Sequence, residues 1–165
     1  MVVDPARARL RRMSRAVIGT AQAIEEVFQD SGFRYRAAMV TLTYGPDEEW
    51  EPNDVARLCN HYRMWATRRG IRICGVWVLE LTKQDRPHYH LVLFIPRGYT
   101  PPLPDKQGWW RKGHTNAKWA HRPVGYIAKY ASKGTYGGLP AGARLHGHIG
   151  LTKRCLLYTS DAADE

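Results

Sequence analysis

Side chains of residues 36–44 alternate between two kinds, and a period of two residues predicts a β-strand. Residues 71–82, which are rich in β-branched and aromatic residues, and residues 88–96 are predicted as two further strands. In the first segment the alternation separates two faces. One face consists of Ala38, Val40, Leu42 and Tyr44, and the other of Met39, Thr41 and Thr43. We therefore predict three strands, the first with a fully apolar face.

Helical spacing of apolar residues predicts three helices. The first covers residues 5–30, and its five early arginines either contact phosphates or form a solvated face. The second opens after Asn53, which can cap it, and ends at Arg68-Arg69-Gly70, where cations precede a glycine. The third covers residues 123–133.

The remaining segments are irregular in pattern. Residues 101–123 mix tryptophans with basic residues, and permit short strands around Trp109 and over residues 116–120. These rings either stack on the bases of single-stranded nucleic acid or fill a small core. Residues 134–153 are rich in glycine. This setting argues that a second histidine pair, His146-Gly147-His148, forms neither a rigid strand nor a pair of metal ligands.

The length and net charge of the chain limit the number of domains and the kind of partner to expect. A chain of 165 residues is one domain by length, and its net charge of +10 suggests an acidic partner such as nucleic acid. A merely soluble basic protein has the same charge. No apolar run reaches membrane-span length, so we expect no membrane partner and a cytoplasmic location. Three cysteines without CxxC spacing argue against a disulfide framework or a zinc knuckle.

The last eleven residues, 155–165, resemble the in-frame translation of a transposon-based sequencing adapter. We interpret them as a scar that is not native, and exclude them from the fold. Without their three carboxylates, the rest of the chain is more basic still. The alternative is a genuine, weakly structured tail.

His88 and His90 open the third strand, so both imidazoles point to one face. If Glu80 pairs opposite His90, its carboxylate shares that face. Two imidazoles and one carboxylate suit a divalent ion such as Mg²⁺ or Mn²⁺, without excluding zinc. The alternatives are one core and one exposed histidine, with Glu80 a surface carboxylate paired to Lys83 or Arg86.

The third helix has one polar face, on which 3.6 residues per turn place two phenols and two ammonium groups. These are Tyr126, Lys129, Tyr130 and Lys133. The opposite face, with Val124, Ile127, Ala128 and Ala131, can pack on a sheet. A phenol beside a lysine and a metal-bound phosphate could attack phosphorus and form a phosphotyrosine. The alternative is an amphipathic helix with exposed tyrosines.

Three motifs together carry a resemblance to a known family. They are Met39-Val40-Thr41-Leu42-Thr43-Tyr44, Arg86-Pro87-His88-Tyr89-His90-Leu91, and Tyr126-Ile127-Ala128-Lys129-Tyr130 with Lys133. In order and spacing they resemble the HUH rolling-circle replication initiators, especially those of filamentous-phage-like elements and related bacterial plasmids. A segment at residues 139–145 also resembles the phage members. One departure is Tyr89, which is bulkier and more polar than the usual aliphatic residue between the histidines.

The resemblance implies an α+β fold: an antiparallel sheet of about five strands with helices packed on it, related to RNA-recognition and ferredoxin-like folds. It divides the chain into a basic helical segment, residues 1–34, and an HUH nuclease domain, residues 35–154. His88, His90 and Glu80 carry over as metal ligands, although the third ligand varies in the family. Tyr126 and Tyr130 carry over as first and second nucleophiles, and Lys129 as a helper near the leaving group or the DNA. For DNA binding we add Lys133, Arg144 and Lys112.

The implied activity is that of a metal-dependent, site-specific endonuclease and strand transferase that initiates rolling-circle replication. Tyrosine would attack single-stranded or stem-loop origin DNA, remain joined to the 5′ phosphate and free a 3′ hydroxyl. We expect a host helicase as a further partner and the cytoplasm of a bacterial host as the location. The alternatives are an HUH transposase or relaxase, and a non-catalytic nucleic-acid-binding module of the same fold.

Overall fold

The computed structural model describes residues 4–132 and 143–151, which form three helices and a five-stranded antiparallel sheet. The strand order is β4-β1-β3-β2-β5. The elements in chain order are α1 (Pro5–Ser31), β1 (Tyr35–Thr43), α2 (Asp54–Arg68), β2 (Cys74–Leu81), β3 (Pro87–Pro96), β4 (Thr115–Ala120), α3 (Pro123–Ser132) and β5 (His146–Ile149). This architecture confirms the predicted α+β fold.

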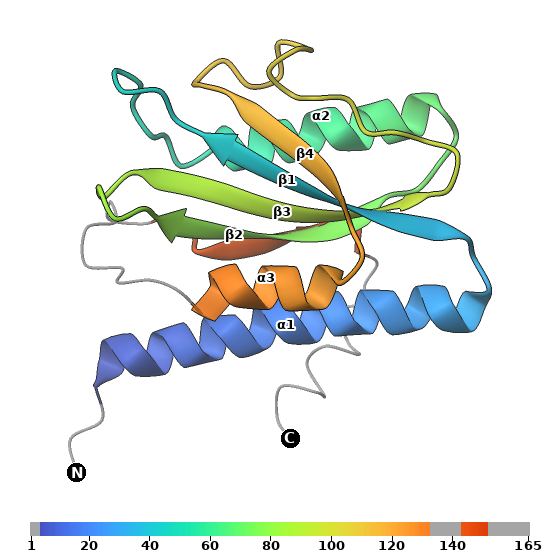
Figure 1. The fold of residues 1–165 in the computed structure, drawn as a ribbon, viewed down its shortest axis with the longest axis horizontal. Coiled ribbons are helices and arrows are strands. Elements are labelled where there is room, and N and C mark those ends of the chain that lie inside the picture. The colour runs from blue at the N-terminus through green and yellow to red at the C-terminus, as the bar shows by residue number, and fades with distance from the viewer. Residues whose placement is uncertain (1–3, 133–142, 152–165) are drawn as a thin grey trace.

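The sheet lies between two helical layers, with α2 on one face and the pair α1 and α3 on the other (Figure 1). Two apolar clusters fill the two interfaces. The strand β3 contributes to both, because its alternate residues point to opposite faces. Leu91 and Leu93 face α2, whereas Val92 and Phe94 face α1 and α3. The central strand is therefore buried on both sides.

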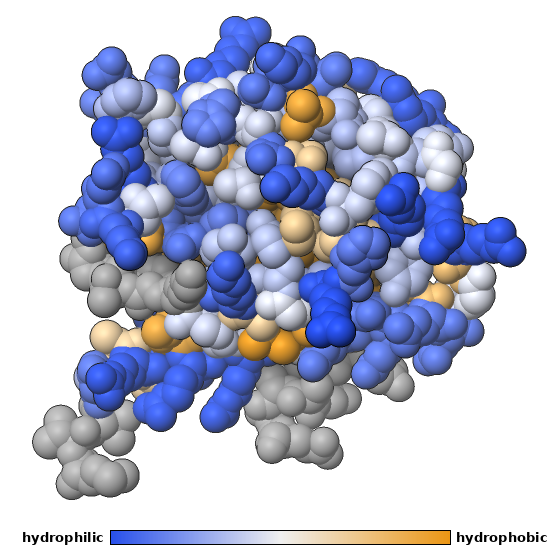
Figure 2. Space-filling model, viewed as in Figure 1, coloured by the Kyte–Doolittle hydropathy of each residue, from blue (hydrophilic) through white to orange (hydrophobic). Residues whose placement is uncertain are grey.

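The long helix α1 spans the lower edge of the molecule in Figure 1 and packs against α3. Asp4 caps its N-terminus by accepting the Ala6 N–H with its carboxylate, and Gly32, in the left-handed region with φ 67°, caps its C-terminus. Its buried stripe consists of Met13, Val17, Ala21 and Ile24. Polar residues cover most of the face seen in Figure 2, with apolar residues in small patches. Within the described segments, no helix combines the length and apolar character that crossing a bilayer requires.

The pairing of β2 with β3 differs from the sequence prediction by two residues. Glu80 lies opposite His88, and Val78, not Glu80, lies opposite His90. The reason is the connection: the Thr82 N–H donates to the Arg86 carbonyl, which closes a tight turn in which Asp85 has φ 57°. A shift of two residues preserves the face, so Glu80 still shares the face of both histidines.

The segment 146–149 forms a strand, contrary to the prediction that its glycine setting would leave it irregular. As β5 it pairs with β2, with Gly147 opposite Trp77. A Cβ at Gly147 would lie 2.5 Å from the Trp77 indole, so the missing side chain leaves room for that ring. The lack of a side chain at Gly147, which argued against a strand in the sequence, is therefore what allows β5 to pack beside Trp77.

The tryptophans of residues 101–123 contribute mainly to the core. No strand forms around Trp109; Trp110 is 4% exposed and its indole N–H donates to the Thr43 carbonyl at 3.1 Å. Trp109 and Trp119 are partly buried against the same cluster. The predicted strand near residues 116–120 is confirmed as β4, whereas β2 begins at Cys74, three residues later than predicted.

The close approach of Gly147 to Trp77 predicts a specific cost. We expect Gly147→Ala to lower the free energy of unfolding by about 1–3 kcal/mol, because the added methyl must displace a packed indole. Gly19→Ala is the matched control: Gly19 lies in α1 with open space around its Cβ position, so this change should be neutral or stabilising by up to about 1 kcal/mol. Urea denaturation measures both. Equal stability of the two variants would contradict the pairing of β5 with β2.

Candidate active site

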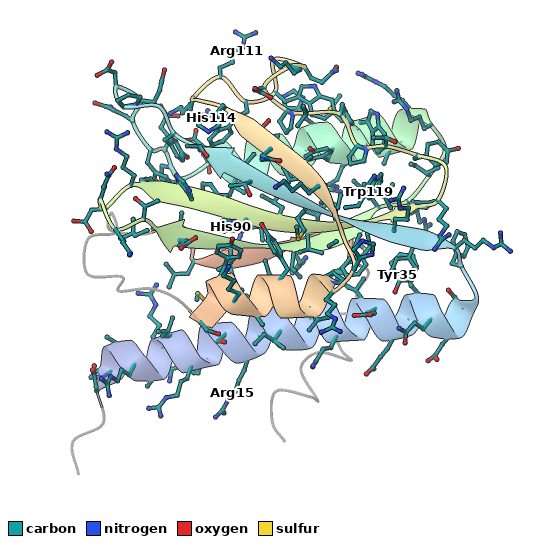
Figure 3. All side chains as sticks on the ribbon, in the orientation of Figure 1. Arg15, Tyr35, His90, Arg111, His114 and Trp119 are labelled. Carbon is teal, nitrogen blue, oxygen red and sulfur yellow. The ribbon has the colours of Figure 1, made fainter. Side chains whose placement is uncertain are left out.

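His90 lies at the centre of the candidate site, on the face of β3 that α3 covers (Figure 3). Its side chain is flanked across the sheet by Thr41 of β1 and Val78 of β2. The residue is only 4% exposed, which makes it one of two buried polar residues in the described part of the chain. A buried imidazole needs partners for its ring nitrogens.

The His90 ring contacts side chains from β2 and α3. Its Nε2 lies 2.5 Å from Oε2 of Glu80, and its Nδ1 lies 3.3 Å from the hydroxyl of Tyr126. The ring of Tyr130 stacks on the imidazole, with centroids 3.5 Å apart and planes inclined by 16°. The structure thus brings the predicted third ligand and both predicted nucleophiles together around one histidine.

The two tyrosines reach His90 because α3 packs closely on the sheet. Ile127 and Ala131 are fully buried in the cluster shared with α1 and the sheet. Tyr126 and Tyr130, one turn apart, meet edge to face with centroids 5.0 Å apart. The burial of Ile127 and Ala131 agrees with the predicted packing face, but Tyr126 and Tyr130 are not on an opposite, exposed face, because both pack against the same cluster.

Two further groups accompany the tyrosines. The Lys129 ammonium lies 5.5 Å from the centroid of the Tyr130 ring, and the Tyr126 hydroxyl lies 3.5 Å from Oγ1 of Thr41. Sequence reasoning did not single out Thr41. The signal was available, since Thr41 is a hydroxyl on the non-apolar face of the first strand and so faces the same side as the histidines.

Burial shifts the proton equilibria of the site. It raises the pKa of Tyr126 above its ordinary value; Thr41 opposes this shift through its hydrogen bond, and Tyr130 and Glu80 add to it. Burial also lowers the pKa of His88, and His114 lowers it further. The shift favours the neutral form of His88, the form in which an imidazole can bind a metal, and it disfavours ionisation of the Tyr126 phenol unless a cation lies nearby.

The donor types around β3 fit a divalent ion. Two imidazoles and a carboxylate on one face are ligands that such ions accept. Within the described residues, however, no group of three or more His, Cys, Asp or Glu side chains is arranged to hold a metal ion. Glu80 instead contacts His90 directly, and the rings of His88 and His90 are 6.4 Å apart. Metal coordination would require Glu80 to exchange its contact with His90 for the ion.

The residues predicted to bind DNA are scattered. Lys133 lies outside the described residues. Arg144 is exposed just before β5. Since the Leu79 N–H donates to the Leu145 carbonyl, the backbone of Arg144 lies at the end of the sheet that carries Glu80. In the register of β2 and β5, Arg144 is therefore level with Glu80 of the candidate site.

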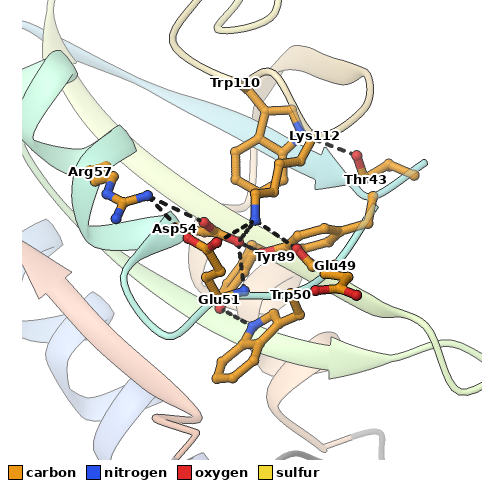
Figure 4. Close-up of polar contacts among 10 residues, drawn as sticks. Thr43, Glu49, Trp50, Glu51, Asp54, Arg57, Tyr89, Trp110 and Lys112 are labelled. Atoms are coloured by element: carbon orange, nitrogen blue, oxygen red, sulfur yellow. Dashed lines mark hydrogen bonds and ion pairs between the residues drawn. The ribbon is translucent and has the colours of Figure 1, made fainter. Parts of the chain in front are cut away.

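Lys112 lies on the opposite face of the sheet, in a polar network that the sequence did not reveal (Figure 4). Its ammonium donates to the Glu49 carbonyl at 2.7 Å and lies 3.4 Å from Oδ2 of Asp54. That buried carboxylate also accepts from the Tyr44 hydroxyl at 2.7 Å. Lys112 therefore compensates a buried charge and connects two loops, which is a structural role.

The order of motifs in the chain and their arrangement in the fold agree with what the resemblance implied: a histidine pair on a central strand and a tyrosine-bearing helix against it. The family of replication-associated proteins of the ORF2 and phage gene II protein type matches residues 37–135. This match covers more than half of the chain and includes all three motifs. The chain therefore belongs to this family of replication-associated proteins, named in part for the gene II protein of filamentous phages. No curated protein and no solved structure matches the chain significantly.

The network around Lys112 predicts a stability effect separate from DNA binding. We expect Lys112→Gln to lower the free energy of unfolding by about 1–3 kcal/mol, because the Asp54 carboxylate loses a charged partner. Lys106→Gln, an exposed lysine in the same connection, should change it by less than about 0.5 kcal/mol.

Thermal or urea denaturation checks this prediction. In a Lys112→Gln/Asp54→Asn double variant, the two losses should be less than additive, since the interaction is already absent in each single variant. Strictly additive losses would contradict the coupling.

Proposed function

We propose that this protein nicks and rejoins single-stranded origin DNA through a 5′-phosphotyrosine intermediate, and so initiates rolling-circle replication. The observation that carries the proposal is the convergence on His90: the Tyr126 hydroxyl lies 3.3 Å from its Nδ1, and the Tyr130 ring stacks on the same imidazole. Membership of a replication-associated family supplies the biological setting.

The proposed reaction is a transesterification. The phenolic oxygen of a tyrosine attacks the scissile phosphorus, a new P–O bond forms, and the bond from phosphorus to the 3′ oxygen breaks. The 3′ oxygen leaves with a proton, and the 5′ phosphate stays on the tyrosine. One P–O bond is exchanged for another, so no energy source is consumed and the reverse reaction rejoins a strand.

Each nearby group has a role in this proposal. Thr41 orients the Tyr126 hydroxyl through its 3.5 Å contact. Lys129, whose ammonium lies beside the Tyr130 ring, stabilises developing charge near the leaving group. His88, His90 and Glu80 would hold a Mg²⁺ or Mn²⁺ ion. When bound, such an ion supplies Lewis acidity to the phosphate oxygens.

Two tyrosines on one helix suit a reaction with two transfer steps. Tyr126 and Tyr130 are one turn apart and both contact His90, so both can approach the same phosphate site in turn. In the proposal Tyr126 opens the cycle by nicking. Tyr130 then cuts after one round, and the freed 3′ hydroxyl rejoins the strand.

The competing functions differ in what they require. A non-catalytic nucleic-acid-binding module of the same fold predicts tyrosine hydroxyls far from the histidines, and the 3.3 Å contact of Tyr126 with His90 argues against it. Transposases and relaxases share the chemistry, but the family match favours a replication initiator. The proposed partners are single-stranded or stem-loop origin DNA, gripped in part by Lys133 and Arg144, and a host helicase.

A covalent-adduct assay tests the proposal. With Mn²⁺ and labelled single-stranded origin DNA, we expect the wild type to form a protein–DNA adduct that survives denaturing electrophoresis. Tyr126→Phe and Tyr130→Phe should each retain one nucleophile, whereas the double variant should form none. Tyr99→Phe, which changes a tyrosine outside the site, is the control and should behave as wild type. Adduct formation by the double variant would rule out the tyrosine assignment.

Metal dependence gives a second test. Chelation with EDTA should abolish adduct formation, and added Mn²⁺ should restore it. His88→Ala and His90→Ala should each weaken Mn²⁺ binding at least about tenfold in a calorimetric titration, because each removes one imidazole ligand. His61→Ala, on α2 across the sheet, is the control. Adduct formation that is equally fast in EDTA would refute the metal assignment.

A further inference from the structure

A basic, aromatic hollow opens at the end of the sheet opposite to the candidate active site. Its volume is about 970 Å³, and it lies between the C-terminal end of α1, the start of β1 and the end of β4. We refer to it as the α1–β4 hollow. Its lining includes Phe33, Arg34, Tyr35, Arg36, Arg97 and Trp119.

Most of the hollow lies toward the other end of β1 from the tyrosine site, although its lining also includes Pro123, the first residue of α3. Tyr35 pairs with Pro96 at one end of β1, whereas Thr41, six residues further along, pairs with His90. The strand between Tyr35 and Thr41 is about 20 Å long, from the usual rise of a β-strand. Figure 3 shows the same separation, with Tyr35 and Trp119 at one end of the sheet and His90 nearer the other.

The charge of the hollow is positive. Three arginines with exposed side chains line it, namely Arg34, Arg36 and Arg97, against one carboxylate, Glu25. In the described part of the chain, none of the three arginines forms an ion pair. Arg36 stacks on Trp119, so the guanidinium groups of Arg34 and Arg97 are the two that remain available for phosphate oxygens, which guanidinium binds in bidentate geometry.

Aromatic rings accompany these cations. Phe33 is 62% exposed, the largest exposed fraction among the large apolar side chains described. The Arg36 guanidinium lies 3.8 Å above the Trp119 ring, which forms a flat cation–π platform. Exposed rings beside guanidinium groups are the composition that binds single-stranded nucleic acid, since each base offers a face for stacking.

We propose that the α1–β4 hollow binds nucleotides of single-stranded DNA, with a base stacked on Phe33 and phosphates held by Arg34 and Arg97. Its volume lies in the range of pockets that hold small organic ligands, enough for a nucleotide. This inference rests on the proposed function in one respect, the choice of DNA as the nucleic acid that binds. The hollow is a second contact with the substrate, which holds the strand about 20 Å from the site of nicking.

Stacking and charge can be tested separately by fluorescence anisotropy with labelled single-stranded DNA. The protein carries Tyr126→Phe and Tyr130→Phe to prevent covalent capture, and the buffer contains EDTA. On this background, Phe33→Leu should lower the affinity for single-stranded DNA about tenfold, because leucine keeps the apolar surface but loses the ring. Phe33→Tyr, which keeps a ring, should bind as the parent does. Duplex DNA, whose bases are already stacked, should show no loss with Phe33→Leu.

The arginines are tested by the salt dependence of the affinity. Arg34→Gln/Arg97→Gln should reduce the slope of log affinity against log salt by about 1.4, or about 0.7 for each lost phosphate contact. Phe33→Leu should leave that slope unchanged. The matched control is Arg63→Gln/Arg68→Gln, which removes the same charge from exposed positions of α2 on the other face of the sheet.

Three results would overturn the inference: undiminished affinity of Phe33→Leu, an equal loss on duplex DNA, or an equal change in slope for the α2 control. The assay uses neither the tyrosines nor a metal. If the wild type fails to nick DNA but the variants show these losses of affinity, the proposed function is refuted and DNA binding by the hollow is supported. A protein that nicks but binds normally with Phe33→Leu would refute the hollow alone.

Discussion

The pairing of β3 with both of its neighbours is the constraint on which the candidate site depends. Backbone hydrogen bonds fix Thr41, His90 and Val78 in one row across three strands. The side-chain period of two then directs the histidines to the face of α1 and α3. A slip of one residue would place the imidazoles in the α2 cluster and bring Tyr89 to the site. Burial of β3 on both faces makes such a slip costly, since it would exchange every core side chain.

Helix packing supplies the rest of the geometry. The stripe of Met13, Val17 and Ala21 on α1 forms a surface against which Ile127 and Ala131 are buried. That contact fixes the rotation of α3 about its axis, and hence the direction of Tyr126 and Tyr130. Apolar packing at residues without chemical function thus determines how far each phenol lies from His90. In the basic N-terminal segment, α1 is thus part of the core that positions the tyrosines.

The sequence predicted the faces well and the register poorly. The alternating direction of side chains along a strand is a local property, so it correctly assigned Thr41 and His90 to faces. The offset between β2 and β3 depends on the turn at residues 82–86, whose conformation requires a positive φ at Asp85. Asp tolerates that conformation, but the residue type alone does not require it. The strand β5 was missed because the reason for a glycine at position 147 is its contact with the Trp77 ring. Trp77 is distant in sequence, so local sequence patterns do not reveal this contact.

Tyr89, the departure from the usual aliphatic residue between the histidines, is explained by the opposite face of β3. Its ring packs in the α2 cluster, edge to face with Trp77 at 5.6 Å, and its hydroxyl accepts the Trp50 N–H at 2.8 Å. Burial raises the pKa of Tyr89 to about 12, so the hydroxyl stays neutral. A satisfied hydroxyl costs little in a core, whereas an unsatisfied one would be expensive. An aliphatic residue here would leave the Trp50 N–H without this acceptor. Tyr89 therefore connects the loop before α2 to the strand that positions His88 and His90. Packing on the α2 face of β3 thus helps to hold the histidines on the opposite face.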